Sequence, residues 1–167
     1  MNNPRIEAQC RIDTPLGPLT LAATAHGLAG AWFDGQKHHP GTLDAPVDAA
    51  HPQLRRAARA IAAYFADGHA PLDLPLDAEG TAFQRDVWRA LCAIAPGTCA
   101  TYGEVARRVG RPAAVRAVGA AVGRNPVSIV VPCHRVVGSD GSLTGYAGGL
   151  DRKQALLALE GAAPARR

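Results

Sequence analysis

The 167-residue sequence lacks the long uncharged apolar run that a membrane-spanning helix requires. It also lacks an apolar stretch after residues 2–7, so we expect no secretory signal peptide and a cytoplasmic protein, or a nuclear one if the source has a nucleus. Internal repeats and low-complexity tracts are absent. With 47% hydrophobic and 19% charged residues, the composition excludes wholesale disorder and allows one compact unit or two small domains.

The four cysteines are not arranged for metal binding or for a disulfide framework. Cys10, Cys92, Cys99 and Cys133 form no C-x-x-C pair, so reduced thiols are the simplest interpretation. The N-terminal half adds only scattered histidines to Cys10, namely His26, His38, His39, His51 and His69. We therefore expect no bound metal.

The charge is distributed unevenly along the chain. Residues 1–80 carry 6 Lys and Arg against 9 Asp and Glu, a net −3, whereas residues 81–167 carry 12 against 5, a net +7. A C-terminal half this basic suggests a polyanionic partner, most simply nucleic acid, although a solvated charged surface explains the charge equally well.

Residues 1–80 are expected to form a small N-terminal α/β domain with an antiparallel sheet. Two short apolar runs around a Gly-containing breaker predict a β-hairpin, and apolar residues at helical spacing further on predict a helix. In chain order the expected elements are strands at 19–24 and 28–33, a loop at 34–51, a helix at 54–65 ending at Asp67-Gly68, and a linker at 69–80.

Residues 81–167 are expected to form a mostly helical C-terminal domain, which makes the fold class α+β. Helices are predicted at 83–94, 102–109, 112–122 and 151–160, with a glycine-rich loop at 138–149. Pro112 is a favourable first helical residue, and Asp151 with Gln154 resembles a capping box. The two middle helices, joined by a short turn containing Gly110, are a helix-turn-helix candidate.

The second helix of this pair has an unusual composition. Between 112 and 123 it offers one long polar side chain, Arg116, among Ala, Gly, Val and Pro. A helix that reads bases in the major groove needs several polar side chains, so this one cannot specify a sequence. It fits close approach to a backbone or a minor groove, or packing against another helix.

The most informative segment surrounds Cys133. This residue follows an apolar run and Pro132 and precedes His134, the only histidine after residue 80. A thiol beside an imidazole is a plausible nucleophile pair, although neighbouring side chains of an extended segment point apart and a bridging water is more plausible than a direct bond. Glu160 ends the last helix, where an anion is disfavoured, so it either turns inward to orient an imidazole or is solvated.

These motifs resemble the O6-alkylguanine-DNA alkyltransferases, or methylated-DNA–protein-cysteine methyltransferases. The resemblance covers 81–161 closely and the N-terminal half more loosely. It rests on segments in the family's order and spacing: Pro132-Cys133-His134-Arg135-Val136, Thr101-Tyr102-Gly103-Glu104-Val105-Ala106, Val115-Arg116-Ala117-Val118-Gly119, Asn125-Pro126, Gly145-Tyr146 and Leu156-Leu157-Ala158-Leu159-Glu160-Gly161.

The resemblance implies direct repair of alkylated double-stranded DNA without a cofactor, a membrane or an obligate protein partner. Cys133 would accept the alkyl group from O6 of guanine, and also from O4 of thymine, in one irreversible event after base flipping. His134 would act as a water-mediated base oriented by Glu160, and Asn125 as a hinge. The implied DNA contacts are Arg116, Tyr102, Ala117, Ala114, Gly119, Arg124 and Arg135. The implied substrate pocket is Val136, Tyr146, Ala147 and Gly148, with Tyr102 assisting the flipped base.

Three other hypotheses remain in view. A non-catalytic lesion-binding protein on the same fold would lack the cysteine, which Cys133 disfavours. A cysteine hydrolase using Cys133 and His134 would leave the DNA-binding helices unexplained. A helix-turn-helix regulator would need a recognition helix with more than Arg116.

Overall fold

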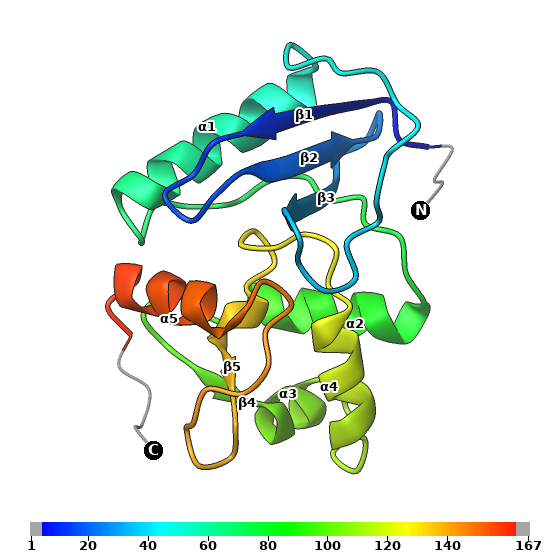
Figure 1. The fold of residues 1–167 in the computed structure, drawn as a ribbon. Helices are drawn as coiled ribbons and strands as arrows, with labels where there is room; N and C mark the ends of the chain where they lie inside the picture. Colours follow the sequence, from blue (N-terminus) through cyan, green and yellow to red (C-terminus); the bar gives the residue numbers. More distant parts are fainter. Residues whose placement is uncertain (1–4, 163–167) are drawn as a thin grey trace. The chain divides into compact units, whose positions relative to one another are not determined.

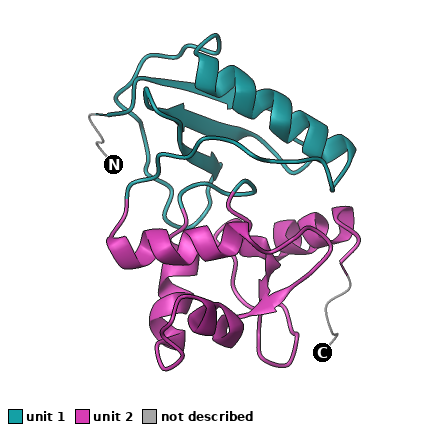
Figure 2. Cartoon of the chain, turned by 180° about the vertical axis from the view of Figure 1, so that it is seen from behind, with its two compact units in different colours: residues 1–79, 126–130 teal, residues 80–125, 131–167 magenta. Residues whose placement is uncertain are grey.

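The computed structural model describes residues 5–162, and these form two compact units. Unit 1 contains the chain up to residue 79 together with 126–130, and unit 2 contains 80–125 with the chain from 131 onwards (Figure 2). One unit holds an antiparallel sheet with a helix and the other is mostly helical, so the α+β class is confirmed.

The sheet of unit 1 has three antiparallel strands in the order β1-β2-β3. These are β1 (Ala8–Ile12), β2 (Leu19–Ala23) and β3 (Leu28–Phe33). The predicted hairpin corresponds to β2 and β3, and β1 is an additional edge strand that pairs Cys10 with Leu21. All residues of β3 are buried, which is typical of a strand covered on both faces.

One face of this sheet is covered by α1 (Pro52–Ala66), which runs along the strands (Figure 1). Its buried residues recur at helical spacing: Leu54, Ala57, Ile61 and Tyr64. The helix begins with Pro52 at a position where no amide hydrogen is needed, and the His51 side chain accepts a hydrogen bond from the Gln53 amide. The predicted helix is confirmed.

Two segments outside the strands complete unit 1. Residues 75–77, expected in the linker, run beside the start of β3, because the Leu28 amide donates to the Pro75 carbonyl at 2.9 Å and the Asp77 amide to the Leu28 carbonyl at 2.8 Å. Residues 126–130 lie beside the middle of the same strand, where the Ala31 amide donates to the Pro126 carbonyl at 2.8 Å. Neither placement is indicated by local sequence, because both are long-range backbone pairings.

Unit 2 opens with α2 (Ala82–Cys92), followed by β4 (Ala100–Thr101) and α3 (Tyr102–Arg108). Both helices begin with a complete capping box, Thr81 with Gln84 and Thr101 with Glu104, in which each side chain satisfies a backbone amide of the first turn. These reciprocal bonds explain why both helices begin where the sequence predicts.

The next helix, α4 (Val115–Gly123), starts three residues later than expected. The prediction that it begins at Pro112 is wrong, because Pro112 and Ala113 occupy a turn closed by the Ala114 amide donating to the Arg111 carbonyl at 2.9 Å. Proline suits the second position of such a turn as well as it suits a helix start. The pair α3 and α4 still forms the expected helix-turn-helix (Figure 1).

The remainder of unit 2 joins a 3₁₀ turn η1 (Cys133–Arg135) to β5 (Val136–Val137), which pairs in parallel with β4. The loop 138–149 leads to α5 (Leu150–Leu159). The expected capping role of Asp151 is wrong. Gly149, with φ of 95°, is the capping residue, and Asp151 lies in the first turn, where its charge favours the helix dipole. Among the described residues no helix is long and apolar enough to cross a membrane.

Gly30 offers a test of the packing of unit 1. A Cβ added to Gly30 would lie 1.9 Å from Cη2 of the buried Trp32 ring, so Gly30→Ala must displace that ring. We expect a loss of about 1–3 kcal/mol in the free energy of unfolding. Gly123→Ala is the control, because its Cβ meets nothing within 4 Å. Urea unfolding measures both, and equal stability of the two variants would contradict the packing.

Candidate active site

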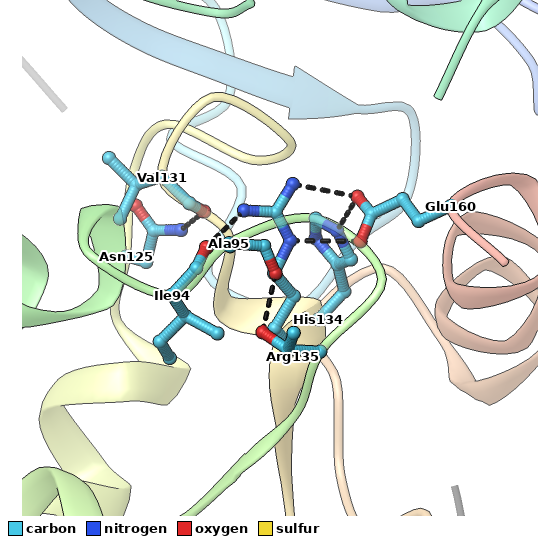
Figure 3. A network of polar contacts seen from close by, with 8 residues as sticks. Ile94, Ala95, Asn125, Val131, His134, Arg135 and Glu160 are labelled. Atoms are coloured by element: carbon cyan, nitrogen blue, oxygen red, sulfur yellow. Dashed lines mark hydrogen bonds and ion pairs between the residues drawn. The ribbon is translucent and has the colours of Figure 1, made fainter. Parts of the chain in front are cut away.

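The candidate nucleophile, Cys133, is buried at the start of η1. The segment is a 3₁₀ turn and not the extended chain expected, but successive side chains of such a turn also point in different directions. The imidazole of His134 lies in a polar cluster with Glu160 and Arg135 (Figure 3).

Asn125 connects the end of α4 to the nucleophile. Its side-chain amide donates to the Val131 carbonyl at 2.9 Å and to Cys133 Sγ at 3.2 Å. Asn125 is buried, and its backbone amide donates to the Val122 carbonyl of α4. A single side chain therefore links the position of the sulfur to the helix-turn-helix.

His134 and Glu160 are in direct contact. Nε2 of His134 lies 2.7 Å from Oε2 of Glu160, and both side chains are fully buried. Glu160 is the residue that caps the end of α5, so of the two alternatives for this carboxylate the inward one is observed. Nδ1 of His134 is buried and has no hydrogen-bond partner among the described residues, which suits a neutral imidazole with its proton on Nε2.

Arg135 belongs to the same cluster and not to an exposed DNA-binding surface. Its Nε donates to Glu160 Oε1 at 2.8 Å, its Nη2 to Glu160 Oε2 at 2.9 Å, and its Nη1 to the Ile94 carbonyl at 2.5 Å (Figure 3). Because the side chain is buried and its guanidinium is occupied, the expectation that Arg135 contacts DNA is wrong.

Lys153 of α5 is a site residue that sequence reasoning missed. Its side chain is fully buried, and Nζ donates to the Val136 carbonyl at 2.5 Å and to the Thr144 carbonyl at 2.8 Å. A third carbonyl, that of Gly145, lies at 3.4 Å. A single lysine on a predicted helix carries no signal of burial, since lysine is usually exposed.

Burial governs the protonation of the two central groups. Burial raises the pKa of the Cys133 thiol, against smaller opposing effects of the Asn125 hydrogen bond and the Lys153 charge. Burial also lowers the pKa of His134, with Glu160 opposing and the charges of Arg135 and Lys153 adding to the decrease. The resting site therefore pairs a neutral thiol with a neutral imidazole.

The residues expected to form the substrate pocket follow this cluster along the chain. Val136 and Gly148 are buried, while Tyr146 and Ala147 are half-buried. The ring of Tyr146 meets that of His134 edge to face, with centroids 6.5 Å apart. Tyr102 lies at the start of α3, and its hydroxyl accepts a hydrogen bond from the Thr144 hydroxyl at 3.3 Å. Tyr102 therefore contacts the same loop.

The remaining expected DNA contacts lie on or beside α4. Arg116, Ala117 and Arg124 are exposed, whereas Ala114 and Gly119 are half-buried. The opposite face of α4 is buried and is held to α2 by the Trp88 indole, which donates to the Ala121 carbonyl at 2.8 Å. One face of α4 is therefore free for a partner.

Residues 5–162 contain no group of three or more His, Cys, Asp or Glu side chains placed to hold a metal ion.

Comparisons with known proteins give consistent matches along the chain. Residues 82–162 match the family model described as 6-O-methylguanine DNA methyltransferase, DNA binding domain, and residues 11–78 match the ribonuclease-like domain of the same family. A methylated-DNA–protein-cysteine methyltransferase of Methanosarcina barkeri is 48% identical over 152 residues, which cover 89% of this chain and 94% of the relative. One from Mycobacterium tuberculosis is 46% identical over 149 residues, which cover 89% of each chain.

Solved structures agree with these matches. The crystal structure of Mycobacterium tuberculosis OGT in complex with DNA has a TM-score of 0.82 and 44% sequence identity, and the match covers 92% of both chains. A structure of an O6-methylguanine DNA methyltransferase from Methanococcus jannaschii has a TM-score of 0.63 at 26% identity, covering 90% of this chain and 92% of that one.

Lys153 gives the site a pH-dependent stability. Burial lowers the pKa of Lys153 from 10.5 to about 8, so between these values the unfolded chain binds a proton that the folded chain does not, and the free energy of unfolding rises with pH. Relative to that of Lys153→Met, the free energy of unfolding of the wild type should increase by about 1–2 kcal/mol between about pH 7.5 and about pH 9.5.

Urea unfolding of both proteins across this pH range measures the difference. Lys37→Met, which removes the exposed lysine of unit 1, is the matched control. Its free energy of unfolding should differ from that of the wild type by the same amount at every pH. A constant difference between the wild type and Lys153→Met would show that Lys153 does not titrate in this range.

Proposed function

Because the chain belongs to the 6-O-methylguanine DNA methyltransferase family, and is therefore an enzyme of DNA alkyl repair, we propose that Cys133 itself takes the alkyl group from the damaged base. The substrates would be O6-alkylguanine and O4-alkylthymine in duplex DNA. The observation that carries the proposal is the buried Cys133 sulfur, held by Asn125 and adjacent in sequence to the His134–Glu160 pair.

The chemistry is a displacement at the alkyl carbon. The thiol proton passes through a water molecule to Nδ1 of His134, and the sulfur forms a bond to the alkyl carbon as the bond from that carbon to O6 breaks. The electron pair of the broken bond stays on the guanine, which takes up a proton from Tyr102. The imidazole releases its proton to the solvent, and Tyr102 recovers one from the solvent. Atoms and charge balance without metal or cofactor.

The product explains why each chain would act once. A thioether lacks the carbonyl that makes an acyl-enzyme susceptible to water, so alkylated Cys133 has no route back to the thiol. The buried position of Cys133 also keeps a general reductant or nucleophile away from the sulfur. The protein would therefore be consumed stoichiometrically with the lesion.

The buried sulfur requires that the damaged nucleotide leave the duplex. Unstacking a base costs a few kcal/mol, and less where the lesion already weakens pairing. The exposed Arg116, on a helix face of small residues, supports the proposal that α4 enters the minor groove and that Arg116 fills the gap left by the base. Arg124 and the other basic residues of this half would contact phosphates without reading sequence.

The proposed pocket for the flipped base lies between the helix-turn-helix and the loop 138–149. Tyr102, joined to Thr144, would hold the base and supply the proton as it leaves, and Tyr146 would form a wall beside His134. The backbone at Val136 and Gly148 would bind the guanine edge. Asn125 would transmit a displacement of the sulfur to α4.

Intact-protein mass spectrometry after incubation with duplex DNA carrying one O6-methylguanine tests the proposal. The wild type should gain one methylene mass on Cys133, at no more than one per chain, and Cys133→Ser should gain none. Binding of the lesion DNA without a mass gain would identify a damage-recognition protein. Release of product with repeated turnover would identify a hydrolase.

The role of Arg116 predicts a substrate-dependent defect. Arg116→Ala should slow methyl transfer from duplex DNA by about tenfold or more, because the cost of extrusion is no longer offset. Transfer from the free base O6-methylguanine should keep its rate, since no extrusion is needed. Arg59→Ala, which removes an exposed arginine of α1, is the control for loss of one positive charge. Equal slowing on both substrates would place Arg116 elsewhere in the mechanism.

A further inference from the structure

Glu160 carries more hydrogen bonds than an imidazole partner alone would need. One carboxylate accepts from His134 at 2.7 Å and from both limbs of the Arg135 fork, at 2.8 Å and 2.9 Å (Figure 3). All three side chains are buried. A planar guanidinium facing a carboxylate in this two-bond arrangement forms the strongest type of side-chain ion pair.

We propose that Arg135 is a positioning residue that neutralises Glu160 and thereby keeps His134 an uncharged proton acceptor. This inference rests on the proposed function of Cys133 and His134, and adds a residue to it. If Arg135 is removed, a proton on His134 can balance the charge of the buried carboxylate through the 2.7 Å contact between them.

Charge balance in the cluster supports this assignment. With Arg135 present, Arg135 and Glu160 sum to zero and a protonated His134 would add a buried net charge, which a low-dielectric interior disfavours. If Arg135 is removed, protonating His134 restores neutrality. The direction of the His134 pKa, lowered by burial and further by the charge of Arg135, agrees with the first case.

Among the described residues, Lys153 is the other cation whose charge acts on His134. Titratable groups from several elements face His134 or the charged groups around it. They are Cys133 of η1 itself, Glu160 and Lys153 of α5, Cys99 before β4, Cys92 of α2, and Tyr146 of the loop. Of these only Lys153 is cationic, and its ammonium donates to the carbonyls of Val136 and Thr144 and not to Glu160.

The neutral state matters for the proposed proton transfer. When Glu160 accepts a hydrogen bond from the Nε2–H group, Nδ1 keeps a free electron pair that can take the thiol proton. A protonated imidazole has no such pair. Arg135 would therefore act on Cys133 through two intermediates, Glu160 and His134, without touching the substrate.

A charge-rescue cycle tests this assignment. In Arg135→Met, ring ¹⁵N NMR should show His134 protonated at neutral pH, and methyl transfer should fall by about tenfold or more and recover as the pH is raised. In the double variant Arg135→Met with Glu160→Gln, His134 should return to its neutral form, because the negative charge of Glu160 is gone. Arg59→Met is the matched control.

A purely structural role makes the opposite prediction, since a second change in the same cluster would then add to the damage of the first. A neutral His134 in folded Arg135→Met would overturn the proposal. If Arg135→Met does not fold, Arg135→Gln, which can still donate to the Ile94 carbonyl, carries the same test, and Arg135→Lys should keep His134 neutral while lowering the melting temperature.

The NMR readout separates this proposal from the proposed function. If Arg135→Met protonates His134 but methyl transfer stays constant or rises, the charge role of Arg135 stands and the base role of His134 fails. If the wild type transfers no methyl group at all, the protonation change in Arg135→Met still tests the role of Arg135.

Discussion

The site depends on the carboxylate of Glu160, because it joins two separate segments directly and a third through Arg135. It joins the end of α5 to His134 and Arg135 of η1, and Arg135 continues to the Ile94 carbonyl beyond α2. A buried carboxylate is costly unless its partners are well placed, and removing one partner costs several kcal/mol. The geometry of the nucleophile segment is therefore tied to the ends of two helices, and a change in either end would reach Cys133.

A second constraint comes from two buried side-chain donors, the carboxamide of Asn125 and the ammonium of Lys153. Asn125 reaches Cys133 from the end of α4, and Lys153 anchors both β5 and the loop that follows it. Both donate to backbone carbonyls, Asn125 to that of Val131 and Lys153 to that of Val136, so their positions are determined by the main chain. The end of α4, Cys133 and the loop 138–149 are thus connected through buried polar contacts.

Local sequence predicted the elements that carry their own signals. The predicted starts of α2 and α3 lie within one residue of the observed ones, although the capping boxes at Thr81 and Thr101 were not used to predict them. The helix α1 follows from periodic apolar residues between Pro52 and Asp67. The inward Glu160 was one of two open alternatives. The start of α4 was missed because proline suits a turn as well as a helix. Arg135 was assigned wrongly and Lys153 was missed, because burial of a cation depends on partners distant in sequence, such as Glu160, 25 residues from Arg135.

The placement of residues 126–130 has a consequence for the modularity of this chain. These residues pair with β3, yet both flanking residues, Asn125 and Val131, belong to unit 2. No single cut can therefore divide the polypeptide into two autonomous fragments. A gene fragment beginning near residue 80 would encode Cys133 together with residues 126–130, but not the strand β3 with which these residues pair. Insertions and fusions are best tolerated at the chain ends, where they do not interrupt the pairing of residues 126–130 with β3.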